Sequence, residues 1–309
     1  MANTDQRKAY GETLLALCKE NKNIIVLDAD LGGSTMGKMV ELELPKQHIE
    51  MGIAEANMLS VAGGLSRVGK IPFVNSFAVF AGGRAFDQIR QSISIGKLNV
   101  KICGSSAGLS DFGDGATHQA VDDIAYMRVI PNMTVIVPAD ANETVAATKY
   151  MAANRGPMYM RVNRNDYENV TPEGAPFKIG VPSVLRDGTD VVVFACGFMV
   201  GKSLKAAKQL EGNISVKVVN VSTIKPMDKK AIIELVKGCK GVVTVEEHSV
   251  IGGLGSAISE ALCKECKPIE YVGVNDRFGL SARNYDDILN YMGLTVEHIE
   301  EAIKTIVNF

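Results

Sequence analysis

Short apolar runs that alternate with segments of helical spacing constrain this chain more than any other feature. In the first half, such runs occur at 24–28, 71–74, 100–103, 134–137 and 158–162, and helical spacing fills the intervals between them. Near-continuous apolar strands separated by helices are typical of a parallel sheet with both faces covered. The pattern therefore predicts an α/β domain.

The alternation breaks at residues 166–189, where three prolines and three glycines cluster, and it resumes at about residue 190. A length of 309 residues suits two domains better than one. We predict two α/β domains, 1–165 and 190–309, each a mostly parallel sheet covered by helices. Residues 166–189 are the expected linker.

Charge and composition exclude several classes of partner and site. The net charge is −2 and no Lys/Arg-rich run occurs, so we expect no nucleic-acid partner. No apolar run has membrane-spanning length, and the first twenty residues lack a signal peptide's apolar core; we expect a cytoplasmic protein without a membrane contact. Cys263 and Cys266 form a lone C-x-x-C and only four histidines occur, so no metal centre is expected on this chain.

Two segments carry candidate functional residues that would be unremarkable alone. Glu55 falls in the first turn of an apolar helix, where a carboxylate usually just interacts with the helix dipole. Phe77 and Phe80 lie three residues apart in a stretch rich in Gly and Ser. Aromatic pairs at this spacing are more often core, although a flat ring could stack on one of them.

The segment 104–119 is the most informative, because four Gly, three Ser and two Asp are concentrated between a strand and a helix. Such loops lie at the carboxyl ends of parallel strands, where α/β proteins bind ligands. His118 is the one side chain in this segment that readily exchanges a proton near neutral pH. Gly113-Asp114-Gly115 followed by Asn142 resembles a magnesium and diphosphate motif, but we favour a different role for this loop.

Seven segments resemble, in order and spacing, the second half of a transketolase. They are LDADLGGST, EMGIAEANM, PFVNSFAVF, DGATHQAVDDIAYMRVIPNM, GPMYMRVNR, VEEHSVIGGLG and GVNDRFGLS. The resemblance implies the pyrimidine-binding domain of a thiamine diphosphate enzyme followed by a transketolase C-terminal-like domain. It also implies a split enzyme, in which a separate N-terminal subunit carries the diphosphate and Mg²⁺ site. Two copies of each subunit, an α2β2 assembly with a self-dimer of this chain, are expected.

The resemblance assigns cofactor contacts to four residues. Glu55 stands where the family has the glutamate that bonds the pyrimidine and promotes its imino form, which acts as the base in catalysis. Phe77 and Phe80 match two aromatics that stack on the pyrimidine, whereas a third family aromatic corresponds to Gly83. Asp30 matches the loop near the thiazolium.

The resemblance also assigns sugar contacts. Asp114 and His118 match residues that bond the hydroxyls and reacting oxygens of a ketose, and His118 is expected to take part in catalysis. Ser34 and Arg164 match residues at the anionic tail of the sugar; a guanidinium suits a tetrahedral anion. Ser106, or a neighbouring residue, replaces a family histidine. This departure leaves phosphate and sulfonate tails both open.

The resemblance therefore implies transfer of a two-carbon ketol unit from a ketose to an aldose. One alternative is the β subunit of a 2-oxo acid dehydrogenase or the later part of a deoxyxylulose phosphate synthase, since the segment RAFDQIR looks equally like these. Another is a non-catalytic binding protein that kept the fold.

Overall fold

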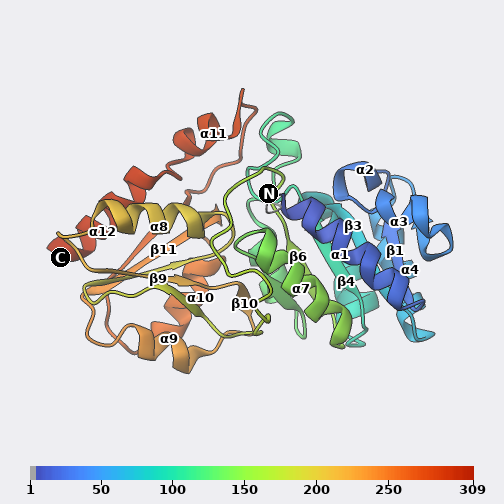
Figure 1. The fold of residues 1–309 in the computed structure, drawn as a ribbon, viewed down its shortest axis with the longest axis horizontal. Helices are drawn as coiled ribbons and strands as arrows, with labels where there is room; N and C mark the ends of the chain where they lie inside the picture. The colour runs from blue at the N-terminus through green and yellow to red at the C-terminus, as the bar shows by residue number, and fades with distance from the viewer. Residues whose placement is uncertain (1–4) are drawn as a thin grey trace.

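Two sheets, one centred in each half of the chain, form the framework of the protein (Figure 1). The structure, a computed structural model, describes residues 5–309. Its first sheet has the strand order β10-β5-β6-β4-β3-β1-β2, and its second the order β12-β11-β8-β9-β7. Within the described residues, only β10 with β5 and β7 with β9 pair in antiparallel fashion. The predicted fold class, two mostly parallel α/β domains, is confirmed.

The inner strands of the first sheet are mostly apolar and buried, whereas the short edge strands β2 and β10 carry polar residues. The strands of this sheet are β1 (Ile24–Asp28), β2 (His48–Glu50), β3 (Ile71–Phe77), β4 (Lys101–Ser105), β5 (Thr134–Ile136), β6 (Met158–Arg161) and β10 (Thr223–Lys225). The second sheet contains β7 (Ser183–Arg186), β8 (Val191–Ala195), β9 (Val216–Asn220), β11 (Gly241–Ser249) and β12 (Ile269–Val274).

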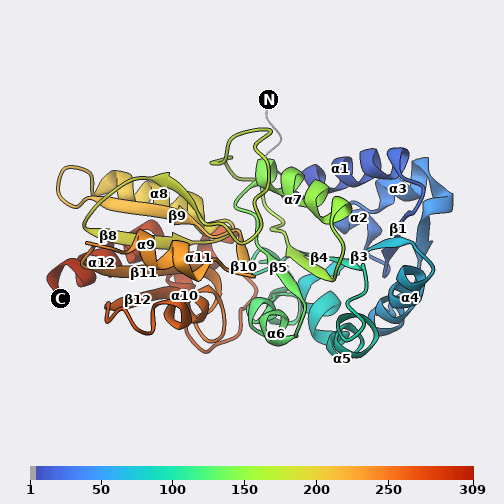
Figure 2. The same cartoon turned by 90° about the horizontal axis from the view of Figure 1, so that it is seen from below.

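Helices cover both faces of the first sheet (Figure 2). α1 (Gln6–Glu20) and α7 (Ala141–Ala153) lie on one face, and α4 (Glu55–Arg67), α5 (Phe86–Gln88) and α6 (Asp123–Val129) lie on the other. The side chains of Asp5 and Asp140 cap the N-termini of α1 and α7, respectively, by accepting hydrogen bonds from backbone N–H groups. The shorter segments are α2 (Gly32–Thr35), α3 (Lys38–Glu43) and the 3₁₀ turns Pro45–Gln47 and Gly115–Thr117.

The second sheet is covered in the same way, with α8 (Met199–Gln209) and α12 (Val296–Asn308) on one face and α9 (Lys229–Leu235) and α10 (Leu254–Leu262) on the other (Figure 1). α11 (Tyr285–Met292) precedes α12. No helix within the described part of the chain is both long enough and apolar enough to cross a bilayer.

The two domains share packed surface. The apolar cluster beside β5 and α6 continues into β10, α9 and α10. Arg161 at the end of β6 donates to the backbone carbonyl of Glu247 in β11, and the Glu247 carboxylate accepts from the backbone N–H of Leu109. The loop that follows β4 is therefore held against the second domain.

Three features differ from the expected pattern. β7 lies inside the segment expected as a linker, and β10, from the second half of the chain, completes the first sheet. The interval between the runs at 71–74 and 100–103, where helical spacing predicts a helix, contains π-helical turns at Val79–Arg84 and Ile89–Ser94 around α5. π-helical turns are rare and occur frequently at functional sites.

Candidate functional site

The carboxyl ends of four parallel strands place the predicted site residues along one edge of the first sheet. Asp30 follows β1, Phe77 ends β3, Ser106 follows β4 and Arg164 follows β6. Ligands of open α/β sheets bind at this edge because the loops there converge. The sequence-predicted residues therefore come from separate segments but share one side of the domain.

Glu55 is the first residue of α4 and is only 1% exposed. Its carboxylate accepts a hydrogen bond from Nη1 of Arg84 at 2.8 Å, and the Arg84 side chain is 48% exposed. A carboxylate this deeply buried requires a cation or hydrogen-bond donors. The ion pair and the helix N-terminus together meet that requirement for Glu55.

An aromatic cluster adjoins this ion pair. The rings of Phe77 and Phe80 are stacked with centroids 6.1 Å apart and an interplanar angle of 15°. His118 meets Phe80 edge-on at 5.3 Å, and the guanidinium carbon of Arg84 lies 4.6 Å from the Phe80 ring centroid. Residues from α4, from the π-helical turn and from the loop after β4 thus form one connected group.

A second polar group surrounds Arg164. Its Nη1 atom is 2.6 Å from the Asp111 carboxylate and 4.0 Å from that of Asp114. Burial raises the pKa of Asp111, the Arg164 charge opposes this shift, and the Asp114 charge adds to it. Asp114 itself is largely exposed, with 57% of its side chain accessible.

Ser34 and Asp30 belong neither to the cluster around Glu55 nor to the polar group around Arg164. The Ser34 carbonyl accepts from Nη1 of Arg7 at 3.3 Å. Burial lowers the pKa of Arg7, and the nearby Arg164 charge contributes to this lowering. Asp30 is exposed, has a positive φ of 57°, and donates its backbone N–H to Glu50. No hydrogen bond or ion pair among residues 5–309 joins Asp30 to Glu55, Arg84, Phe77, Phe80 or His118.

Ser106 occupies the position where the resemblance led us to look for a histidine. It is fully buried and has a φ of +51°. Its hydroxyl and that of Ser105 are buried without a hydrogen-bond partner in the described part of the chain. Buried hydroxyls normally find a partner. Ser76 near the end of β3 and Gln119 in the loop after β4 also carry a buried oxygen without such a partner, so several polar groups at this edge have unused hydrogen-bonding capacity.

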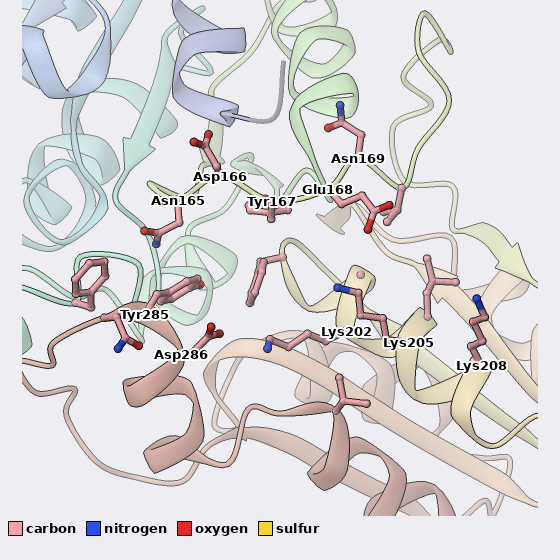
Figure 3. A pocket seen from close by; sticks show the side chains of 17 residues that line it. Asn165, Asp166, Tyr167, Glu168, Asn169, Lys202, Lys205, Lys208, Tyr285 and Asp286 are labelled. Carbon is pink, nitrogen blue, oxygen red and sulfur yellow. The ribbon is translucent and has the colours of Figure 1, made fainter. Parts of the chain in front are cut away.

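A separate cavity of about 740 Å³ lies between α8, α11 and the segment that joins β6 to β7, here called the interdomain segment. Figure 3 shows Lys202, Lys205 and Lys208 on α8, with Asp166 and Glu168 on the opposite interdomain segment. None of the eight predicted site residues lines this cavity. Three lysines and three acidic side chains, the third from α11, balance its charge and select no ligand class.

Among residues 5–309, no group of three or more His, Cys, Asp and Glu side chains is placed to hold a metal ion. Asn142, part of the magnesium-like motif in the sequence, donates instead to the carbonyl of Thr171 in the interdomain segment.

Sequence reasoning did not identify Arg84, Asp111 or Arg7 as site residues. Arg84 follows Phe80 by four residues, and residues four apart are neighbours on a helical turn, so this spacing indicated a contact between the two side chains. Asp111 lies inside the recognised loop, but nothing in its spacing indicates that Arg164 is its partner. Arg7 is brought to Ser34 by the packing of α1.

Comparison with known proteins gives two domain matches. Residues 2–169 match the transketolase pyrimidine-binding domain, and residues 180–299 match the transketolase C-terminal domain. The chain is 40% identical over 302 residues to the 6-deoxy-6-sulfo-D-fructose transketolase subunit of Clostridium sp. (strain MSTE9), covering 97% of this chain and 94% of that protein. It is 35% identical over 309 residues to an apulose-4-phosphate transketolase subunit of Phocaeicola vulgatus, covering 98% and 96%.

Solved structures agree with these matches. One described as a split gene transketolase, inactive β4 tetramer, has a TM-score of 0.89 and 44% identity, with 99% of each chain covered. The transketolase from Leishmania mexicana has a TM-score of 0.85 at 24% identity, and this chain spans 46% of its length. At that identity the second likeness concerns the fold alone.

Proposed function

The chain belongs to the transketolase family, and on that premise we propose that it is the C-terminal subunit of a split transketolase. It would transfer a two-carbon ketol unit from a ketose to an aldose. Two relatives that are themselves named transketolase subunits match it over nearly their whole length. The single structural observation that supports this function best is the buried Glu55 carboxylate beside the stacked Phe77 and Phe80 rings.

These residues suit the pyrimidine end of thiamine diphosphate, the cofactor that the family implies. Glu55 would bond a ring nitrogen from a water-poor position, where proton sharing is favoured over a bare charge. Phe77 and Phe80 would hold the ring by stacking, and Asp30 would lie toward the thiazolium. When bound, the cofactor supplies the carbon nucleophile that this chain's own side chains cannot provide.

The sugar would lie beside His118 and Asp114. His118 would move a proton at the reacting oxygens, and Asp114 would accept from a hydroxyl. Ser34 and Arg164 would bind the far end of the ketose, where a guanidinium favours an anionic group. One relative's name contains a sulfosugar and another's a sugar phosphate, so we propose an anionic tail without choosing between them.

A partner subunit would complete the site. The site opens at an exposed edge, where 57% of the side chain of the predicted residue Asp114 and 48% of the side chain of Arg84, which pairs with Glu55, remain accessible. We propose that an N-terminal transketolase subunit covers this edge and carries the Mg²⁺ and diphosphate ligands. The proposed assembly is α2β2 and cytoplasmic, with paired copies of this chain.

The comparisons do not favour the other readings of the sequence. Relatives of matching length are named transketolase subunits rather than 2-oxo acid dehydrogenase or deoxyxylulose phosphate synthase subunits. A non-catalytic role gains no support from a buried carboxylate held beside stacked rings.

Reconstitution tests the proposal. The full chain is mixed with its N-terminal partner, thiamine diphosphate and Mg²⁺, and ketol transfer is followed with anionic ketoses; pyruvate decarboxylation is measured in parallel. Glu55→Gln should lower transfer by about 10²-fold or more, because it removes the proton-sharing group. Glu20→Gln makes the same chemical change at an exposed residue of α1 and should leave transfer unchanged.

Transfer that is equal in the Glu55→Gln and wild-type complexes would refute the assignment. So would a complex that decarboxylates pyruvate and transfers no ketol unit.

A further inference from the structure

Arg84 makes two contacts that a bound aminopyrimidine would need for itself. Its guanidinium donates to the buried Glu55 carboxylate at 2.8 Å and lies over the Phe80 ring, 4.6 Å from the centroid. A guanidinium is planar, stacks on aromatic faces and donates to carboxylates. An aminopyrimidine ring held by the same glutamate and phenylalanine would have the same three properties.

We propose that Arg84 occupies the pyrimidine position in the cofactor-free subunit and must leave it before the coenzyme binds. This inference rests on the proposed function. The space above Phe80 and the accepting oxygen of Glu55 can serve one planar donor at a time. Arg84 is therefore a positioning residue that acts through Glu55.

The local backbone allows this displacement. Arg84 ends the π-helical turn Val79–Arg84 and follows two glycines, Gly82 and Gly83. A Cβ atom at Gly83 would meet only the Tyr126 hydroxyl within 4 Å, at 3.8 Å, so the path beside Arg84 is open. With 48% of its side chain already exposed, Arg84 can move into solvent without unpacking the core.

Breaking the ion pair costs Glu55 more free energy than it costs Arg84. Arg84 regains water, whereas Glu55, with 2% of its side chain exposed, would become a buried carboxylate without a cation. The pair therefore keeps the buried Glu55 carboxylate hydrogen-bonded until another donor arrives. While the guanidinium holds this carboxylate, a pyrimidine cannot bond to it, so the contact keeps the subunit inactive until the pyrimidine replaces Arg84.

Calorimetry on the reconstituted complex tests the inference. The dissociation constant of thiamine diphosphate with Mg²⁺ is measured for wild type, Arg84→Met and Arg90→Met; Arg90 is an exposed arginine six residues further on. Arg84→Met keeps a long side chain but removes the charge. It should tighten binding about three- to tenfold, because a larger fraction of the subunit is binding-competent. Arg90→Met should leave the constant unchanged.

A second pair of variants isolates the role of Glu55. In the Glu55→Gln background no ion pair exists to be broken and only the contact with Phe80 remains, so adding Arg84→Met should tighten coenzyme binding less than it does in the wild-type background. Arg84→Lys, which keeps the charge but cannot stack as a plane, should give an affinity between those of wild type and Arg84→Met. This variant keeps the test open if Arg84→Met does not fold.

Failure of the inference and failure of the proposed function are distinguishable. A wild-type complex that binds no thiamine diphosphate contradicts the proposed function. A wild-type complex that binds it, with unchanged or weaker binding in Arg84→Met, overturns the role of Arg84 alone. Equal tightening by Arg84→Met in the Glu55→Gln background overturns it as well.

Discussion

The guanidinium of Arg164 lies 2.6 Å from the buried carboxylate of Asp111. The arginine proposed to receive an anionic sugar tail is therefore already paired, and Asp114 stands 4.0 Å from the same nitrogen. Two carboxylates beside one guanidinium leave no net positive charge among these three groups. An incoming anion would have to compete with Asp111 rather than enter a preformed positive site.

Asp111→Asn should strengthen the binding of ketoses with anionic tails. The substitution keeps the shape of the side chain and removes the competing charge next to Arg164. We expect KM for the ketose to fall about two- to fivefold, because an ion pair that is partly exposed on the Arg164 side contributes at most about 1 kcal/mol. Steady-state kinetics of the reconstituted complex measure this effect, and kcat should stay constant.

An uncharged acceptor aldehyde serves as the internal control for this variant. Its KM should not change, since no anion approaches Arg164. A ketose KM that rises in Asp111→Asn would mean that Asp111 orients the arginine for binding instead of competing for it.

His118→Ala should impair the chemical step and leave the coenzyme in place. His118 contacts the Phe80 ring only by its edge, at 5.3 Å, so its loss removes little of the stacking surface. We expect kcat/KM to fall about 10²-fold through loss of a proton-transfer group. The dissociation constant of thiamine diphosphate should be unaffected. His298→Ala, at an exposed position on α12, is the control; an equal loss of activity in both variants would argue against the assigned role.

Asp123→Ala should destabilise the fold strongly. Asp123 is fully buried and accepts from Nε of Arg161 at 2.8 Å and from the Tyr159 hydroxyl at 2.7 Å. Without it, Arg161 is left as a buried cation, which costs about 3–5 kcal/mol. Urea unfolding of the single chain gives this value. Glu234→Ala breaks the exposed pair with Lys237 and should change stability by less than about 0.5 kcal/mol.

Glu247 should make stability depend on pH. Burial raises its pKa to about 7, against a reference value of 4.5, while the Arg161 charge opposes the shift. Between these values the folded chain holds a proton that the unfolded chain has released, so stability falls as the pH rises through this range and then levels off. Relative to Glu247→Gln, which stays neutral, wild type should lose about 1–3 kcal/mol across it.

Denaturant midpoints of both proteins at several pH values measure this difference. The exposed variant Glu234→Gln should differ from wild type by a constant amount over the same range. A constant difference for Glu247→Gln would show that its carboxyl is ionised throughout.

The sequence predicted strands and helices correctly in the parts of the fold where helices cover both faces of a sheet. The strand expected at 24–28 was found at those bounds, and the helix expected with Glu55 in its first turn spans Glu55–Arg67. β10 was not expected, because its three residues pair with a strand from the other half of the chain. Its position depends on how the two domains pack.

Sequence alone determined the two-domain α/β architecture, since apolar periodicity reports directly on which residues must leave water. It also supplied the family resemblance and the residue types of the site. Only the tertiary structure decided which charged residues form ion pairs: Arg84 with Glu55, and Arg164 with Asp111. These partners are 29 and 53 residues apart, and electrostatic contact depends on distance in space, which the order of residues along a chain does not specify.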